Sequence, residues 1–125
     1  MAKEWCVEGI ELKFTINGTD VTQTGTVTIS SQPSSKTKVR SHGVYFDKFE
    51  CKFVGCSYNG YTQTSPANYN IPCGAQYSKE NNKPIMLVED NQTAEGISFQ
   101  QGQSSTTYSI KCEVKDPGQN DIREK

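Results

Sequence analysis

Apolar and polar residues alternate along the first part of the chain with the period of a half-buried β-strand. Positions 10, 12, 14 and 16 are Ile, Leu, Phe and Ile, whereas the positions between them are Glu, Lys and Thr. Because alternate side chains of a strand point to opposite faces, this pattern predicts a strand with one buried face. The strand runs into Asn17-Gly18, which favours a tight hairpin turn, and the Val- and Thr-rich residues 21–29 predict its partner.

A second β-rich stretch follows the polar, turn-forming residues 30–42. The apolar residues between positions 44 and 54 predict that this stretch contributes most to the core. The pair Asn59-Gly60 predicts another turn, and residues 62–75 have few apolar side chains and contain two prolines. We therefore expect residues 62–75 to form a long loop, which makes them a candidate contact surface.

The C-terminal half predicts three further strands. Residues 85–88 are a short apolar run, positions 97 and 99 alternate, and residues 108–114 alternate again before Asp116-Pro117-Gly118 ends the pattern. No window has apolar residues spaced by three and four over the length of a stable helix. The sequence therefore predicts an all-β fold of short antiparallel strands and hairpins, with little or no helix.

The length of 125 residues suits one modest hydrophobic core. We expect a single β domain at residues 1–118, followed by a charged, frayed tail at residues 119–125. A shift of the chain by forty-one positions sets residues 38–46 over residues 79–87, and each segment is a polar turn that leads into a short apolar strand. Only one Lys is identical, and the pattern fits a fold made of two similar β units.

Charge and hydropathy exclude several classes of partner. Thirteen basic and fourteen acidic residues give a formal net charge of −1, which provides no electrostatic footprint for nucleic acid. No apolar run has the roughly 20 residues needed to span a bilayer, and the first residues lack the apolar stretch of a signal peptide. We therefore expect a chain that is made in the cytoplasm without a visible signal peptide, with no membrane segment and no nucleic-acid partner.

One histidine and five cysteines limit the chemistry of the chain. His42, Cys51, Cys56 and Cys73 could supply one nitrogen and three sulfurs to zinc, but their spacing matches no common zinc motif. Free buried thiols therefore rank first, a disulfide second and zinc third. His42 lies in a Ser- and Lys-rich turn, where an exposed imidazole is the commoner state, so a catalytic Cys–His pair has little support.

Other catalytic or cofactor motifs are lacking. The adjacent carboxylates Glu89 and Asp90 follow an apolar stretch, and neighbours on a strand point to opposite faces, so they are expected to be solvated turn residues. No glycine-rich phosphate loop is present. We expect no catalytic residues, no metal, no cofactor and no enzymatic activity.

The tyrosines form a candidate contact surface, because tyrosine gives rigid amphipathic area for binding sugars or proteins. Cross-strand packing is the alternative and carries the greater weight, since β domains use tyrosine for both purposes. The six residues are Tyr45, Tyr58, Tyr61, Tyr69, Tyr77 and Tyr108.

Short motifs spread over residues 31–119 carry a resemblance. They are Pro33-Ser-Ser-Lys-Thr-Lys-Val, Gly43-Val-Tyr-Phe, Gly55-Cys-Ser, Gly60-Tyr-Thr-Gln-Thr-Ser-Pro, Lys79, Lys83-Pro-Ile-Met-Leu-Val-Glu-Asp and Asp116-Pro-Gly-Gln. In these motifs the chain resembles small bacterial phage-like proteins of the PAAR-like group. The resemblance implies a compact β cone that caps a trimeric spike, or contacts another tail component, at the tip of a contractile injection machine. It also implies attachment of effector proteins and export as part of that apparatus.

The chain departs from this group in two respects. PAAR tips of the best-known type bind a metal through several histidines and a cysteine, whereas this chain has a single histidine, and the Pro-Ala-Ala-Arg signature is absent. The resemblance therefore implies a non-enzymatic structural cap, with no metal residues and no effector activity carried over. The alternative is a secreted or surface β-sandwich module that binds carbohydrate or a host protein through the tyrosines and residues 62–75. An enzyme that uses His42 and a cysteine is the third hypothesis.

Overall fold

The computed structural model describes residues 3–75, 78–80, 82–88, 90–119 and 122–124. The prediction of an all-β fold is confirmed, because strands account for 61% of the described residues and helical residues for 3%. In the described ranges the helical residues form one 3₁₀ turn, η1 (Thr22–Thr24). The strands are β1 (Lys3–Glu4), β2 (Glu11–Ile16), β3 (Thr19–Asp20), β4 (Thr26–Ile29), β5 (Lys38–Val39), β6 (His42–Gly43), β7 (Lys48–Val54), β8 (Ser57–Tyr58), β9 (Tyr61–Gln63), β10 (Ala67–Pro72), β11 (Lys79–Glu80), β12 (Lys83–Pro84), β13 (Asn91–Gln101), β14 (Ser104–Asp116) and β15 (Arg123–Glu124).

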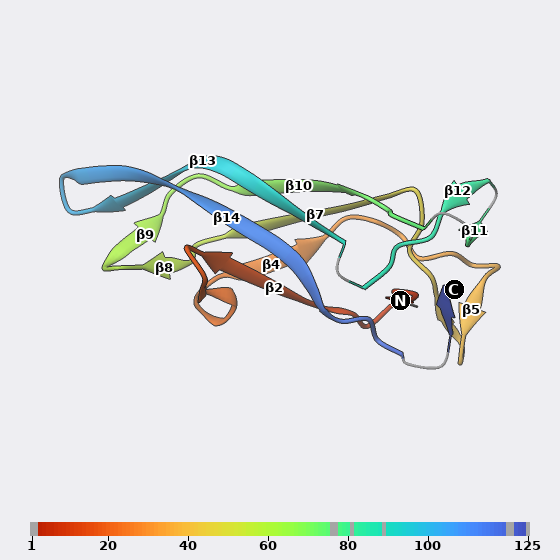
Figure 1. The fold of residues 1–125 in the computed structure, drawn as a ribbon. Coiled ribbons are helices and arrows are strands. Elements are labelled where there is room, and N and C mark those ends of the chain that lie inside the picture. The colour runs from red at the N-terminus through yellow and green to blue at the C-terminus, as the bar shows by residue number, and fades with distance from the viewer. Residues whose placement is uncertain (1–2, 76–77, 81, 89, 120–121, 125) are drawn as a thin grey trace.

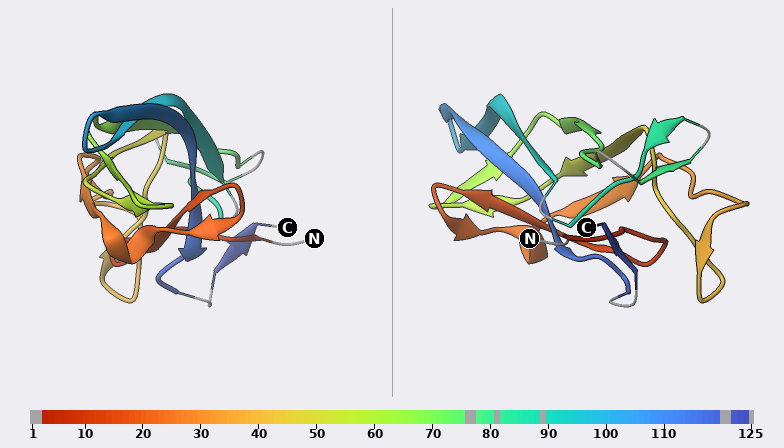
Figure 2. Two further views of the ribbon diagram at one scale, coloured as in Figure 1. Left: turned by 90° about the vertical axis from the view of Figure 1, so that its left-hand side faces the viewer. Right: turned by 45° about the vertical axis from the view of Figure 1, so that its right-hand side comes forward.

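Two antiparallel sheets enclose the main core. One has the strand order β3-β2-β14-β13-β9-β8 and the other has the order β10-β7-β4 (Figure 1). Viewed along the length of the molecule, the sheets curl around a common interior as a half-barrel (Figure 2, left). Alternate residues of β2, β7 and β10 point inwards, and the rings of Phe14 and Phe53 stack across the interior with centroids 4.0 Å apart. The period-two pattern of the sequence thus forms a shared apolar core.

The predicted first hairpin is partly correct. β2 pairs with β3, and Asn17 and Gly18 both have positive φ angles, as the turn prediction requires. The expected continuation through residues 21–29 is wrong, because η1 interrupts it and β4 pairs with β7 instead of β2. The hydroxyl of Thr22 accepts a hydrogen bond from the backbone N–H of Phe14, so a side chain ends the ladder and the chain then turns away from β2.

The predicted long loop at residues 62–75 is also wrong. β9 covers residues 61–63, and β10 pairs with β7 over residues 67–72. Ala67, Tyr69 and Ile71 are buried, whereas the residues between them are exposed. Polar and proline residues occupy the exposed face, so the segment is polar as a whole and its period of two is hidden.

The other sequence predictions agree more closely with the structure. The second β-rich stretch supplies five buried core residues, and Asn59-Gly60 forms the β8–β9 turn with positive φ angles at both positions. β13 and β14 pair as one long hairpin, and β14 ends at Asp116. Residues 85–88 form isolated bridges at Ile85 and Leu87 rather than a strand, because each bridge reaches a different segment.

The expected frayed tail is paired in its described part. β15 pairs with β1, joining the two ends of the chain in one short ladder. The side-chain amide of Gln119 donates to the carbonyl of Trp5 at 2.7 Å and to that of Ile122 at 2.9 Å. Both termini therefore lie at the same end of the molecule as β5, β11 and β12 (Figure 1).

The core strands are organised as three successive units. In each unit a strand leads away from the end that holds the termini, and a second strand returns to it: β2 and β4 in unit 1, β7 and β10 in unit 2, and β13 and β14 in unit 3. Adjacent units are joined by the ladders β14–β2 and β4–β7. The two segments of the sequence echo, residues 38–46 and 79–87, lead into β7 of unit 2 and β13 of unit 3. The echo therefore marks the start of two of the three units.

Candidate protein interface

Three short segments meet at the junction between the core and the end that holds the termini. They are residues 5–7, 44–46 and 85–87, one from each unit, and we call them the three-segment layer. Its isolated bridges are Trp5–Leu87, Val7–Val44 and Phe46–Ile85. Each segment therefore pairs through its first residue with one neighbour and through its third residue with the other.

Backbone hydrogen bonds close this layer into a cycle. The N–H of Cys6 donates to the carbonyl of Met86 at 2.8 Å, the N–H of Met86 donates to Tyr45 at 2.8 Å, and the N–H of Tyr45 donates to Cys6 at 3.0 Å. A second set of three bonds flanks the segments and runs around them in the opposite direction: Glu8 donates to Gly43, and Val88 to Glu4, both at 2.9 Å. Its third bond runs from Asp47 to Pro84 at 2.7 Å. The layer therefore has approximate threefold symmetry, although it belongs to one chain.

Side-chain alternation in the layer separates two apolar clusters. The central residues Cys6, Tyr45 and Met86 belong to the main core. The first and third residues of all three segments lie in a second cluster on the opposite side of the layer, together with Val39 and Ala75. The layer is thus buried on both faces, which holds its backbone rigidly in place.

Three two-stranded ladders cover the second cluster, one beside each segment of the layer. Lys38 pairs with Gly43 in β5–β6, Lys79 pairs with Pro84 in β11–β12, and Arg123 pairs with Glu4 in β15–β1. The first two ladders are displaced by the forty-one positions of the sequence echo. The third is closed by the two ends of the chain. We call these three ladders the hairpin end; it lies opposite the β13–β14 turn (Figure 1).

The hydrogen bonds that hold each ladder to the layer repeat in the same way. The N–H groups of Val44, Ile85 and Trp5 donate to the carbonyls of Thr37, Ser78 and Ile122 at 3.0 to 3.1 Å. The threefold arrangement therefore extends from the buried layer to the surface of the hairpin end.

Polar side chains fix the β5–β6 ladder to the β11–β12 ladder. Ser34 is buried, and its hydroxyl donates to the carboxylate of Glu80 at 3.0 Å, to which Thr37 also donates. The indole N–H of Trp5 donates to the hydroxyl of Ser78 at 3.0 Å, which links residues 5–7 to the start of the β11–β12 ladder. These contacts make the hairpin end one connected structure.

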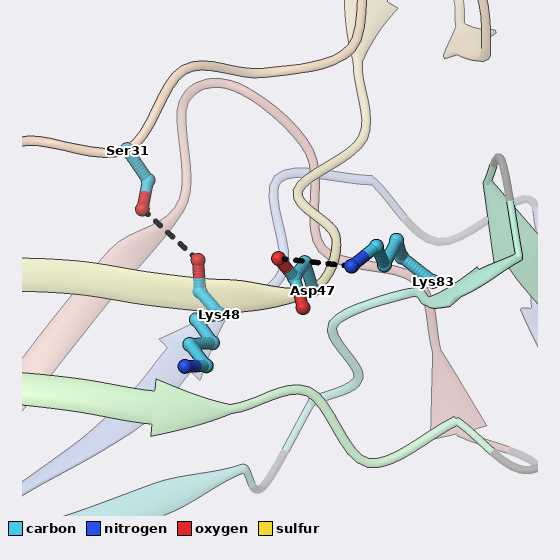
Figure 3. A network of polar contacts seen from close by, with 4 residues as sticks. All are labelled: Ser31, Asp47, Lys48 and Lys83. Atoms are coloured by element: carbon cyan, nitrogen blue, oxygen red, sulfur yellow. Dashed lines mark hydrogen bonds and ion pairs between the residues drawn. The ribbon is translucent and has the colours of Figure 1, made fainter.

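The junction between the layer and β7 carries a further network (Figure 3). The hydroxyl of Ser31 donates to the carbonyl of Lys48 at 3.1 Å and accepts from the N–H of Glu50 at 2.7 Å. The ammonium of Lys83 lies 4.0 Å from a carboxylate oxygen of Asp47, and both side chains are about half exposed. An ion pair this exposed contributes little to stability, and its charges stay accessible at the surface.

The candidate zinc ligands do not come together. His42 is exposed in β6, whereas Cys51, Cys56 and Cys73 are buried in the main core. In the described ranges no group of three His, Cys, Asp or Glu side chains is placed to hold a metal ion. All five cysteines are buried and form no disulfide in the structure, as the alternative of free buried thiols predicts.

Burial also raises the pKa of the buried thiols. Desolvation raises the pKa of Cys56 to about 11, and desolvation together with the nearby Asp90 and Asp47 carboxylates raises that of Cys73 to about 12. A hydrogen bond with Cys51, followed by desolvation, raises the pKa of Cys112 far above its ordinary range. These thiols are protonated near neutral pH, so they lack the thiolate character of a nucleophile.

Most of the tyrosines take part in packing. Tyr45 and Tyr69 are buried, and the hydroxyl of Tyr69 donates to the carbonyl of Ile110 at 2.8 Å. Tyr58 and Phe99 pack edge-on against Tyr108 with centroids 4.9 and 5.1 Å away, and Tyr61 packs against the same ring at 6.4 Å. Tyr77 lies outside the described residues. All five described tyrosines therefore take part in packing within the domain.

The carboxylate pair is described only in part, because Glu89 lies outside the described residues. Asp90 accepts hydrogen bonds from the backbone N–H groups of Gly74 at 3.0 Å and Leu87 at 2.9 Å. Its carboxylate therefore caps a turn at the edge of the three-segment layer. Asp116 has a similar role, since it accepts from the N–H of Gly118 at 2.9 Å.

The hairpin end was not among the sites expected from the sequence. The sequence feature that could have indicated it is the echo at forty-one positions. This echo links the β5–β6 and β11–β12 ladders but not the β15–β1 ladder. That third ladder joins residues from opposite ends of the chain, so no shift along the sequence brings them together.

Within the described ranges, no helix has the length and apolar character needed to cross a bilayer.

Comparison with known proteins finds no matching family, no similar curated protein and no similar solved structure.

Proposed function

We propose that this chain is a non-enzymatic structural protein, a PAAR-like cap or tip of a phage-tail-like or contractile injection spike. The observation that carries the proposal is the cyclic hydrogen bonding of the three-segment layer. A trimeric spike ends in three identical surfaces around one axis. A monomer with three similar surfaces around its own axis can contact all three subunits in similar ways, whereas an asymmetric monomer cannot.

The positions of the sequence motifs support this proposal. The motifs that begin at Pro33, Gly43, Lys83 and Asp116 all lie in the layer or in the segments that lead to the hairpin end. With Lys79, five of the seven motifs therefore lie in the threefold part of the molecule, and the motifs at Gly55 and Gly60 lie around β8 and β9. The carbohydrate-binding alternative depended on a tyrosine surface and a long loop; each described tyrosine packs against another ring of the fold, and residues 62–75 contain strands.

Co-purification with a trimeric spike tests the proposal. The chain is co-expressed with the spike protein encoded beside it in its own genome, and the mass of the complex is measured by size-exclusion chromatography with light scattering. We expect one chain per spike trimer. Separate elution of the two proteins at micromolar concentrations would remove the basis of the proposal.

A pair of matched variants locates the contact. K38E/H42E/K83E changes three exposed residues of the hairpin end, and Q103E/S104E/S105E changes three exposed residues at the opposite end. We expect the first variant to lose the complex and the second to retain it, with both variants folded by circular dichroism. The reverse result would place the spike contact at the β13–β14 turn.

A further inference from the structure

Unit 1 differs from the other two units in the pairing of its strands. β7 pairs with β10 in unit 2, and β13 pairs with β14 in unit 3. β2 and β4 of unit 1 are fully described, and they do not pair with each other. The half-barrel is therefore open between β2 and β4, and we call this opening the seam.

Backbone hydrogen-bonding groups point into the seam from both sides. The N–H of Ser30 donates to the carbonyl of Glu50 in β7. In an antiparallel ladder the backbone groups of successive residues point alternately towards and away from the partner strand. The N–H and C=O groups of Val27 and Ile29 therefore point away from β7 and into the seam. The carbonyl of Phe14 accepts from Val21 on the side away from β14, so Leu12, two residues earlier, also faces the seam. The seam thus has two edges that can each accept a strand.

Apolar side chains line the interior of the seam. Val27 and Ile29 lie opposite the buried residues Phe53 and Cys51, so they point to the core side of the sheet, yet they are 38% and 36% exposed. With Ile10 and Leu12 they line a cleft of about 370 Å³. Most strands that face a core bury such residues, so these two lack a covering element.

The rim of the cleft is polar and charged. Glu11, Asp20 and Lys115 line it together with Thr22 and Gln23. Hydrogen bonds from Thr22 lower the pKa of Asp20, and the charges of two nearby lysines act in the same direction, so Asp20 is ionised at neutral pH. The cleft therefore combines an apolar floor with a rim of both charge signs.

We propose that the seam binds an extended β-strand from a partner protein, with apolar side chains pointing inwards and polar side chains outwards. An extended strand presents backbone donors and acceptors at every second residue along each of its edges. One edge of such a strand matches the backbone groups of Val27 and Ile29, and its other edge faces Leu12. A second copy of this chain is less suitable, because its β4 belongs to its own sheet and would pair with one edge only. This site is separate from the hairpin end, so it does not depend on the proposed cap.

Amide hydrogen exchange with a defined peptide tests the proposal. The probe is the synthetic peptide Lys-Thr-Val-Thr-Val-Thr-Val-Thr-Lys, with blocked ends, added to the complete chain and followed by NMR. We expect slower exchange at the amides of Val27, Ile29 and Leu12, by about tenfold when the peptide is at ten times its dissociation constant. The same peptide with Pro in place of its central Val lacks one N–H donor and should protect these amides less.

Two variants of β4 complete the test. Val27→Lys places a charge on the floor of the cleft and should abolish protection, whereas Thr28→Lys points to the opposite face and should retain it. Because both positions are exposed, both variants should keep the circular dichroism spectrum of the parent chain. Unchanged exchange at millimolar peptide would overturn the proposal, as would protection confined to other strands. Protection that depends on protein concentration without peptide would instead identify a second copy as the occupant.

Discussion

The side-chain amide of Gln92 makes two hydrogen bonds with the backbone of Asn70, accepting from its N–H at 2.7 Å and donating to its carbonyl at 3.0 Å. In the described residues no backbone ladder joins β10 and β13, although ladders join the other two pairs of adjacent units. Near the β8–β9 turn β13 pairs with β9, and beside β10 the side chain of Gln92 makes the hydrogen bonds that a backbone ladder would otherwise make.

Substitution of Gln92 should weaken this boundary. Gln92→Ala removes both hydrogen bonds and should lower the free energy of unfolding by about 1–2 kcal/mol, measured by urea denaturation. Gln92→Glu retains the acceptor and loses the donor, so it should have an intermediate effect near neutral pH. Gln103→Ala, in the exposed β13–β14 turn, is the control and should change stability little. Equal stability of Gln92→Ala and Gln103→Ala would show that the Gln92 contacts contribute nothing.

Gly43 in the hairpin end should not tolerate a side chain. A Cβ atom at this position would lie 2.1 Å from the backbone carbonyl oxygen of Ser34, which cannot move without disturbing the ladder. Gly43→Ala should therefore destabilise the chain by about 2 kcal/mol or more. The matched control is Ser35→Ala, at an exposed position beside Ser34. A thermal melt that is the same for both variants would contradict the close approach.

Removal of residues 119–125 should expose Trp5, the only tryptophan of the chain. This deletion removes the Gln119 amide that donates to the Trp5 carbonyl and the carbonyl of Ile122 that accepts from the Trp5 N–H at 3.1 Å. We expect the fluorescence maximum of the truncated chain to shift towards that of the chain in guanidinium chloride. A frayed tail would leave the spectrum unchanged, so this measurement separates the sequence prediction from the structure.

Stability should fall at alkaline pH because of the buried thiols. The pKa of Cys56 rises from 9.0 to about 11 on folding, and that of Cys73 rises from 9.0 to about 12. Above about pH 9 the unfolded chain loses thiol protons that the folded chain retains, so the free energy of unfolding decreases as pH rises. We expect a lower urea midpoint at about pH 9.5 than at about pH 8, and a smaller decrease in Cys56→Ala.

A thiol reagent provides an independent measurement. Because all five cysteines are buried and free, 5,5′-dithiobis(2-nitrobenzoic acid) should react slowly with the native chain near neutral pH and with five thiols after unfolding. Rapid reaction of the native protein would contradict the burial of the thiols.

Local patterns were sufficient for part of this fold. The alternation at positions 10–16 and the two Asn-Gly pairs identified β2, the β2–β3 turn and the β8–β9 turn, because these features depend on neighbouring residues only. The loop prediction for residues 62–75 was wrong because their buried residues, Ala67, Tyr69 and Ile71, are few and separated by polar ones. The prediction for residues 21–29 was wrong because the choice between β2 and β7 as the partner of β4 depends on contacts distant in sequence.

The sequence by itself determined the β class, the positions of the tight turns and the absence of long helices, since period and turn chemistry act over a few residues. Only the tertiary structure decided that three segments starting at residues 5, 44 and 85 close one cycle of hydrogen bonds. It alone also showed that the two ends of the chain complete the third ladder and that β2 and β4 remain apart. The physical reason is that strand pairing satisfies backbone groups that are the same in every residue, so the choice of partner is made by the packing of the whole core.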